Sequence, residues 1–290
     1  MEGTAFSVRS TDPGLLEVLR RYLGVHLIDR PEIGERHYRF SADCGEELKG
    51  AGGLRARRVG SLYLNTLRLF RARGFDEMAG RFISSLRDIA TFGQDQFVRI
   101  RAGAVVAGGS VLVLPAEPEP HLPGLVAHLV RRGAEYLADE VVRIEPVLRE
   151  VHPLPLPLLL AIEDMPDFPE IRREPATSRR TEDREGLRQI RYAVLPEEVA
   201  GSTAGPGVPG RVVFPRFEPG ETALETIGSA DALFAFARAG LNFHVWGERA
   251  LILGREMLSS VPTATLRVGS MARAADILLE ESSAPGAMYG

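Results

Sequence analysis

The middle of the chain constrains the fold most strongly. Residues 111–114 (Val-Leu-Val-Leu) form a continuous apolar run, which is typical of a strand buried on both faces. A proline-rich loop at 115–123 follows, and residues 124–132 have the pattern of a short helix that Gly133 would end. Residues 136–144 indicate a second strand with two acids in its middle. Strand, loop, helix and strand in this order predict a βαβ unit and therefore an α/β fold.

The first 95 residues indicate a small α+β region with its own helices. Asp12 followed by Pro13 has the pattern of a helix N-cap and first helical position. Apolar residues recur at helical spacing in 61–73 and again in 75–92, so we expect a helix in each. The predicted division is therefore an α+β region at 1–95 ahead of the core.

The core is predicted to span residues 96–282, with a small polar tail at 283–290. Residues 164–186 are polar and charged, which predicts a surface excursion or mobile loop. Beyond them, apolar patterns predict strands and helices in alternation: strands at 192–195, 211–215 and 261–268, and helices at 229–239, 249–259 and 270–280.

Composition excludes several classes of protein. The formal charge of −4 argues against a nucleic-acid binder. Cys44 is the only cysteine, so the chain has neither an internal disulfide nor a cysteine metal cluster, and we predict no metal site. No stretch reaches membrane-spanning length, and the first residues lack a signal-peptide pattern. We expect a cytoplasmic protein without membrane partners.

The loop before the 124–132 helix is where a phosphate-binding kinase would carry its glycine-rich loop. Such a loop follows a buried strand and opens a helix; its glycines expose backbone N–H groups, its lysine reaches the β- and γ-phosphates, and a Ser or Thr binds magnesium. Here that stretch is Ala116-Glu117-Pro118-Glu119-Pro120-His121-Leu122-Pro123-Gly124.

The residues around this loop resemble the HPr serine kinase/phosphorylase superfamily, and in particular the HPr-kinase-like proteins of biosynthetic gene clusters. The resemblance lies in residues 131–134 (Arg-Arg-Gly-Ala), 136–140 (Tyr-Leu-Ala-Asp-Glu) and 151–158 (Val-His-Pro-Leu-Pro-Leu-Pro-Leu). It implies a phosphoenolpyruvate-carboxykinase-like P-loop kinase core. The specific part covers about fifty residues, and Arg101 stands where the family has a histidine.

The loop itself departs from the family pattern. In a gapless comparison, Leu122 takes the lysine position, Pro123 and Gly124 take the hydroxyl positions, and Glu119 and His121 replace glycines. Proline has no N–H to donate, and side chains at glycine positions block close approach of the backbone. Each close contact between a carboxylate and a phosphate costs roughly a few kcal/mol near a protein surface. These residues predict a degenerate loop that does not bind ATP.

Two further sets of residues are candidates for a site. The resemblance implies that Asp139 acts as general base in active relatives and that Asp139 and Glu140 together assist magnesium; here the pair is either vestigial or atypical. Arg211 and Arg216 flank a predicted strand in the region where the family carries a late arginine, so they are possible anion contacts.

Three hypotheses remain open from the sequence. The first is a pseudo-enzyme that keeps the kinase fold, transfers no phosphate, has no cofactor and binds a protein or peptide as a scaffold or regulator. The second is an atypical ATP- and magnesium-dependent kinase that uses Asp139 as base on a serine hydroxyl or small molecule. The third is a structural subunit of a larger complex; since the resembling family includes ring-shaped oligomers, a homo-oligomer is a possible assembly here too.

Overall fold

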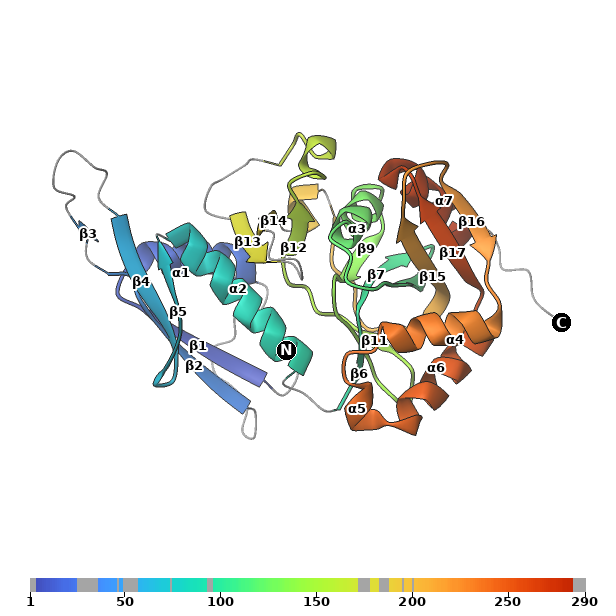
Figure 1. The fold of residues 1–290 in the computed structure, drawn as a ribbon, viewed down its shortest axis with the longest axis horizontal. Coiled ribbons are helices and arrows are strands. Elements are labelled where there is room, and N and C mark those ends of the chain that lie inside the picture. Colours follow the sequence, from blue (N-terminus) through green and yellow to red (C-terminus); the bar gives the residue numbers. More distant parts are fainter. Residues whose placement is uncertain are drawn as a thin grey trace. The chain divides into compact units, whose positions relative to one another are not determined.

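The computed structural model describes the chain in two compact units. The described residues are 4–24, 36–45, 47–48, 57–73, 75–92, 96–171, 178–182, 188–194, 196–199 and 201–283. The first unit contains Met1–Ala90 and Arg172–Ala193, and the second contains Thr91–Ile171 and Val194–Gly290. The protein is thus a mixed α/β fold with several sheets (Figure 1). None of the described helices is long and apolar enough to cross a membrane.

The first unit is built on a sheet with two helices. Its elements are β1 (Thr4–Ser10), α1 (Pro13–Leu23), β2 (Arg36–Asp43), β3 (Glu47–Leu48), β4 (Arg57–Leu64), β5 (Leu67–Arg73), α2 (Phe75–Phe92) and the hairpin of β13 (Ser178–Glu182) and β14 (Arg188–Val194). Strand β1 runs parallel to β2, and β4 pairs antiparallel with both β2 and β5. The predicted N-cap is confirmed, because the Asp12 carboxylate accepts a hydrogen bond from the N–H of Gly14.

The prediction of a helix at residues 61–73 is wrong. These residues form parts of β4 and β5, and they turn at Asn65, whose φ of 54° lies in the left-handed region. The two strands pair with an irregularity between Leu62 and Tyr63, and Leu62 is fully buried in the same core cluster as Phe40 and Phe82. The spacing of the leucines fits both periods, so the short turn between the two runs decides the structure.

The second unit contains a six-stranded mixed sheet in the order β16-β17-β15-β8-β7-β9. Its elements are β6 (Val98–Ile100), β7 (Ala102–Ala107), β8 (Ser110–Pro115), α3 (Leu122–Arg131), β9 (Glu135–Ala138), β10 (Val142–Ile144), β11 (Val151–His152), β12 (Leu158–Ala161), the 3₁₀ helices η2 (Met165–Asp167) and η4 (Pro196–Val199), β15 (Pro209–Phe217), β16 (Ala223–Thr226), α4 (Ser229–Arg238), α5 (Phe243–Trp246), α6 (Glu248–Ser260), β17 (Thr263–Val268) and α7 (Met271–Ser283). Helix α3 packs against α7, and α4 packs against α6.

The predicted strand-helix-strand unit is present as β8, α3 and β9. Both strands pair antiparallel with β7, which lies between them, so β8 and β9 run in the same direction. Strands β15 and β17 are parallel to β8 as well. The carboxyl ends of four strands therefore meet at one edge of the sheet.

The prediction of a single strand over residues 136–144 is wrong. Strand β9 ends at Ala138, Glu140 takes a left-handed φ of 59°, and β10 joins a different sheet with β6 and β11. The N–H of Val141 donates to the carbonyl of Asp139 at 2.6 Å, which closes a tight turn at the acidic pair. The two acids thus lie just beyond a strand end instead of in the middle of a strand.

The segment predicted as a polar excursion at 164–186 is partly built into the fold. Asp164, Met165, Phe168 and Ile171 are buried in the second unit, whereas residues 178–182 form β13 of the first unit. Residues 172–177 and 183–187 of this prediction lie outside the described residues, as do residues 284–290 of the predicted tail.

Candidate functional site

The carboxyl edge of the second unit's sheet is the candidate site. In open α/β sheets, ligands bind in the crevice outside the carboxyl ends of the parallel strands. The loop between β8 and α3, the segment after β15 and the start of α7 all follow such strand ends. The sequence-predicted loop and the Asp139–Glu140 turn both lie at this edge, which brings two of the predicted sets to one side of the sheet.

The predicted loop residues are used for packing and internal polar contacts. Leu122, at the lysine position, is buried and lies near Gly103 of β7. Glu119 accepts a hydrogen bond from the N–H of His121 at 3.1 Å, and Glu117 pairs with Arg238 at 2.6 Å. Helix α3 begins with Leu122, Pro123 and Gly124, and its N-cap residue makes no side-chain capping bond.

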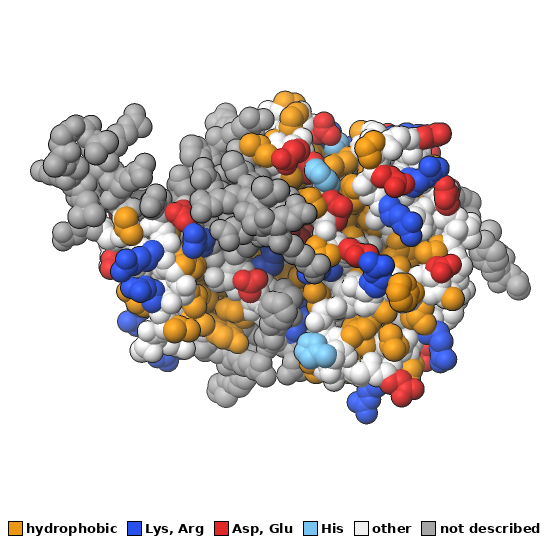
Figure 2. Space-filling view, in the orientation of Figure 1, with side chains coloured by type: hydrophobic (Ala, Val, Ile, Leu, Met, Phe, Trp, Pro, Cys, Tyr) orange, Lys and Arg blue, Asp and Glu red, His pale blue; other side chains and the backbone are white. Residues whose placement is uncertain are grey.

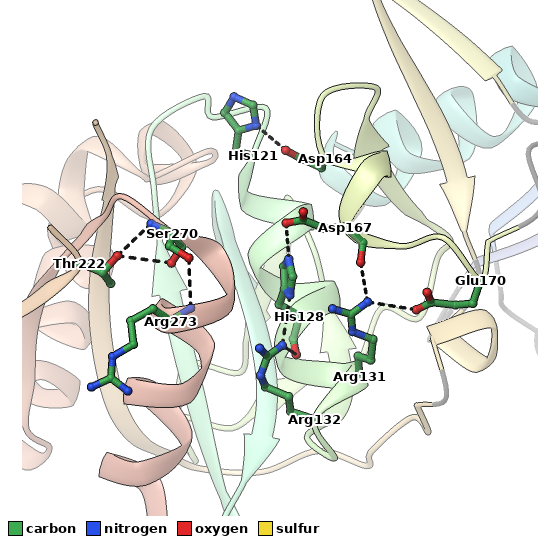
Figure 3. Close-up of polar contacts among 10 residues, drawn as sticks. All are labelled: His121, His128, Arg131, Arg132, Asp164, Asp167, Glu170, Thr222, Ser270 and Arg273. Atoms are coloured by element: carbon green, nitrogen blue, oxygen red, sulfur yellow. Dashed lines mark hydrogen bonds and ion pairs between the residues drawn. The ribbon is translucent and has the colours of Figure 1, made fainter. Parts of the chain in front are cut away.

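A histidine and a buried acid form the main polar contact at this helix end (Figure 3). His121 Nδ1 lies 2.8 Å from Asp164 Oδ1, and the Asp164 side chain is only 3% exposed whereas His121 is 34% exposed. The hydrogen bond to Asp164 raises the pKa of the His121 imidazole; burial opposes this, and the charges of Asp164, Glu119 and Glu163 add to it. His121 therefore pairs with a buried carboxyl group at the start of α3, and this pairing favours the protonated imidazole.

The other oxygen of Asp164 faces the first turn of α3. Asp164 Oδ2 is buried and has no hydrogen-bond partner among the described residues. A Cβ on Gly124 would lie 2.7 Å from this oxygen and 2.9 Å from the Met271 sulfur, so glycine is the residue that fits there. The space beside the helix N-terminus is filled by a carboxylate of the chain itself.

The start of α7 is also closed by the chain's own polar groups. Thr222 Oγ1 accepts hydrogen bonds from the N–H groups of Gly269 at 3.2 Å and Ser270 at 2.9 Å. Figure 3 shows the contact between Thr222 and Ser270. Ser270 Oγ accepts from the N–H of Arg273 at 3.4 Å. These backbone donors, which would otherwise be available to an anion at a helix start, are satisfied internally.

A second polar cluster fixes the 164–171 segment onto α3. Arg132 Nη1 lies 3.1 Å from His128 Nδ1, and since a guanidinium only donates, His128 carries its proton on Nε2 and donates to Asp167 at 3.0 Å. Burial lowers the pKa of the His128 imidazole, while the bond to Asp167 opposes that shift. Arg131 donates to the carbonyl of Asp167 and stacks 4.7 Å from the Phe168 ring. These contacts hold Asp164 in its position.

The predicted acidic pair, Asp139 and Glu140, is engaged in contacts that stabilise the fold. Asp139 is 1% exposed; the Tyr136 hydroxyl lies 2.8 Å from Oδ1, and the N–H of Leu159 donates to Oδ2 at 3.4 Å. The same hydroxyl lies 2.9 Å from the carbonyl of Leu156. Both Asp139 oxygens thus lie within hydrogen-bonding distance of donors in the protein, with the single Tyr136 proton shared between Asp139 and the Leu156 carbonyl. Glu140 forms the turn that follows.

The two arginines predicted as anion contacts differ in whether their charge is paired and in their exposure. Arg211 Nη2 pairs with Glu281 at 3.2 Å, so its charge is compensated within the second unit. Arg216 is exposed near the end of β15. Among the described residues no group of three or more His, Cys, Asp or Glu side chains could hold a metal ion.

Three residues at this edge of the sheet were not predicted from the sequence. Asp164, Phe217 and Thr222 come from segments well separated from the 116–124 loop, and Phe217 lies 6.1 Å from the His121 ring between centroids. A scan of protein-family models found none that matches the sequence, and a search of curated proteins returned no match. The resemblance to the HPr-kinase-like group therefore depends on the motif residues alone.

Proposed function

We propose that this chain is a catalytically degenerate HPr-kinase-like protein with a phosphoenolpyruvate-carboxykinase-like core, which binds a protein or peptide and does not transfer phosphate. The observation that carries the proposal is the buried Asp164 carboxylate, which lies against Gly124 in the first turn of α3. A phosphate at that helix end would find the space beside the first turn filled by the Asp164 side chain, and His121, the cationic group nearest to it, is already paired with that carboxylate.

Three features of the loop support the same conclusion. Leu122 is packed in the core and offers no charge, and Pro123 has no N–H. The Glu119 carboxylate already accepts a hydrogen bond from the N–H of His121. The atypical kinase with Asp139 as base is less well supported, because that carboxylate is buried and engaged by Tyr136 and Leu159.

The charge of this edge favours a partner segment that presents basic groups. Glu163, Glu218 and Glu221 are exposed on segments at this edge, where Arg216 is an exposed base; Glu117 is compensated by its ion pair with Arg238. Carboxylates clustered in this way attract cationic side chains and repel phosphate or acidic peptides.

Isothermal titration of the purified protein with ATP and magnesium tests the loss of phosphate chemistry. We expect neither heat nor a thermal shift at millimolar nucleotide. Saturable binding accompanied by ATP hydrolysis that Asp139→Asn abolishes would overturn the proposal and favour the atypical kinase.

A paired anisotropy measurement tests the partner class. Two labelled peptides of equal length, one rich in lysine and arginine and one rich in glutamate, are titrated with the protein at low salt. We expect binding of the basic peptide only, weakened when Glu163 and Glu221 are replaced by glutamine. Equal binding of both peptides, or no effect of the substitutions, would contradict the acidic edge as the binding surface.

A further inference from the structure

Helix α6 leaves aliphatic side chains in solvent on the face that points away from the second unit's core. Leu251 and Ile252 are 42% and 39% exposed, whereas Leu253 and Met257 on the opposite face are buried. Helix α4 packs against α6, because Phe236 and Leu233 contact Gly254. Figure 2 shows hydrophobic side chains gathered over α4, where Phe234 is exposed. The charges that flank Leu251 and Ile252 indicate an interaction surface on α6.

The sequence of α6 is nearly palindromic about Ile252: the residue types read almost the same toward either end of the helix. Residues 248–256 are Glu-Arg-Ala-Leu-Ile-Leu-Gly-Arg-Glu, and only Ala250 and Gly254 break the symmetry. The four charged residues of this stretch are exposed, and none has an ion-pair partner in the described part of the chain.

The helical period divides these four charges into two flanks. At about 100° per residue, Glu248 and Arg255 lie on one side of Ile252, and Arg249 and Glu256 lie on the other. At about 1.5 Å per residue, Glu248 lies roughly 6 Å from Ile252 toward one end of the helix, and Arg255 lies roughly 4.5 Å toward the other. Each flank therefore carries one acid and one base at nearly equal distances from the centre.

This arrangement is self-complementary in an antiparallel pair. A two-fold axis through the Ile252 contact places each flank beside the same flank of the second copy with its direction reversed. Glu248 then faces Arg255 of the other copy, and Arg249 faces Glu256, which gives four opposite-charge pairs around an aliphatic centre. The antiparallel direction also opposes the two helix dipoles.

We infer that a second copy of this chain docks on α6, forming a two-fold dimer through antiparallel α6 helices centred on Ile252. Six residues of each copy make the contact: Glu248, Arg249, Leu251, Ile252, Arg255 and Glu256. The interface is small and depends on charge, so the dimer is salt-sensitive. It uses none of the residues at the acidic edge and does not rest on the proposed function.

Sedimentation velocity of the full chain at low and high salt tests the dimer. The wild type is expected to dimerise at micromolar to high-micromolar concentration. Ile252→Glu places two like charges at the centre and gives a monomer. Arg255→Glu turns two attractive contacts into two repulsive ones and raises the dimer dissociation constant roughly 10- to 100-fold. Circular dichroism confirms that these exposed substitutions leave the fold intact.

A charge exchange separates the antiparallel dimer from other arrangements. Glu248→Arg with Arg255→Glu restores both pairs in the antiparallel dimer, so dimerisation returns, whereas in a parallel pairing the same exchange sets like charges beside Arg249 and Glu256. Arg273→Glu, the same charge change on an exposed site of α7, is the control and leaves the dimer unchanged. A monomeric wild type, a dimer indifferent to Ile252→Glu and Arg255→Glu, or an exchange variant weaker than Arg255→Glu alone would overturn the inference.

Discussion

Replacing Gly124 by alanine tests whether the Asp164 carboxylate fills the space at the start of α3. The added methyl would lie 2.7 Å from Asp164 Oδ2, 2.9 Å from Met271 Sδ and 3.0 Å from Asp164 Cγ. Overpacking of this kind costs about 1 to 3 kcal/mol. The higher helix propensity of alanine recovers up to about 1 kcal/mol. The net destabilisation in the wild-type background is therefore roughly 0 to 3 kcal/mol.

The decisive quantity is how this cost changes when the carboxylate is removed. In an Asp164→Ala background the two contacts with the carboxylate disappear and only the contact with the flexible end of the Met271 side chain remains. Gly124→Ala then costs less than in the wild type, and the coupling between the two sites is about 1 to 3 kcal/mol. Urea unfolding followed by Trp246 fluorescence suits the measurement, because the Trp246 indole donates to the carbonyl of Phe97 within the second unit.

A matched control separates packing from a general effect of alanine. A Cβ on Gly205 has no heavy atom within 4 Å, so Gly205→Ala is expected to leave the second unit as stable or to stabilise it by up to about 1 kcal/mol. If the effects of Gly124→Ala and Asp164→Ala add to within about 0.3 to 0.5 kcal/mol, the reasoning about this contact is refuted.

The two histidines on α3 and its N-cap are expected to give opposite pH dependence. The raised pKa of His121 contributes stability below the ordinary value of 6.5 that is lost as pH rises through the folded-state pKa. The lowered pKa of His128 contributes stability above 6.5 that is lost as pH falls toward its folded-state pKa. NMR titration of both imidazoles checks the directions, and Asp164→Asn must lower the pKa of His121 while leaving His128 unchanged. Tyr136→Phe removes the donor to the buried Asp139 and is expected to destabilise the second unit by about 1 to 3 kcal/mol in urea unfolding. The control is Tyr63→Phe, because the Tyr63 hydroxyl has no hydrogen-bond partner in the described part of the chain. An equal loss of stability from the two substitutions would contradict the Asp139 contact.

Local signals allowed the helix-and-strand pattern around α3 to be predicted. The continuous apolar run of β8, the N-cap at Asp12 and the helix α2 each depend on residues close in sequence, and each is present. The hairpin at 61–73 was mistaken for a helix because its leucines fit both periods, and only the two-residue turn at Asn65 distinguishes them. The break after Ala138 was missed because Asp139 and Glu140 turn the chain through a left-handed residue that no local pattern demanded.

The candidate site was less accessible to sequence reasoning. The loop from residue 116 to 124 could be identified as unsuited to phosphate from its residue types alone. The partner of His121 could not be predicted, because Asp164 belongs to a segment whose polar composition indicates a surface excursion. Only the contacts of His128 and Arg131 with that segment place it over α3. Side-chain contacts between distant segments leave no periodic mark in a sequence.

The most direct test of the central claim is an amide NMR titration of the protein with pyrophosphate and then with ATP and magnesium, following the backbone signals of His121, Gly124 and Leu125. Since the chain's own carboxylates occupy the start of α3, these signals are predicted to stay within the range of shifts caused by sodium chloride at equal ionic strength. Saturating shifts confined to Gly124 and Leu125 would show that a phosphate binds at this helix end and would contradict the account.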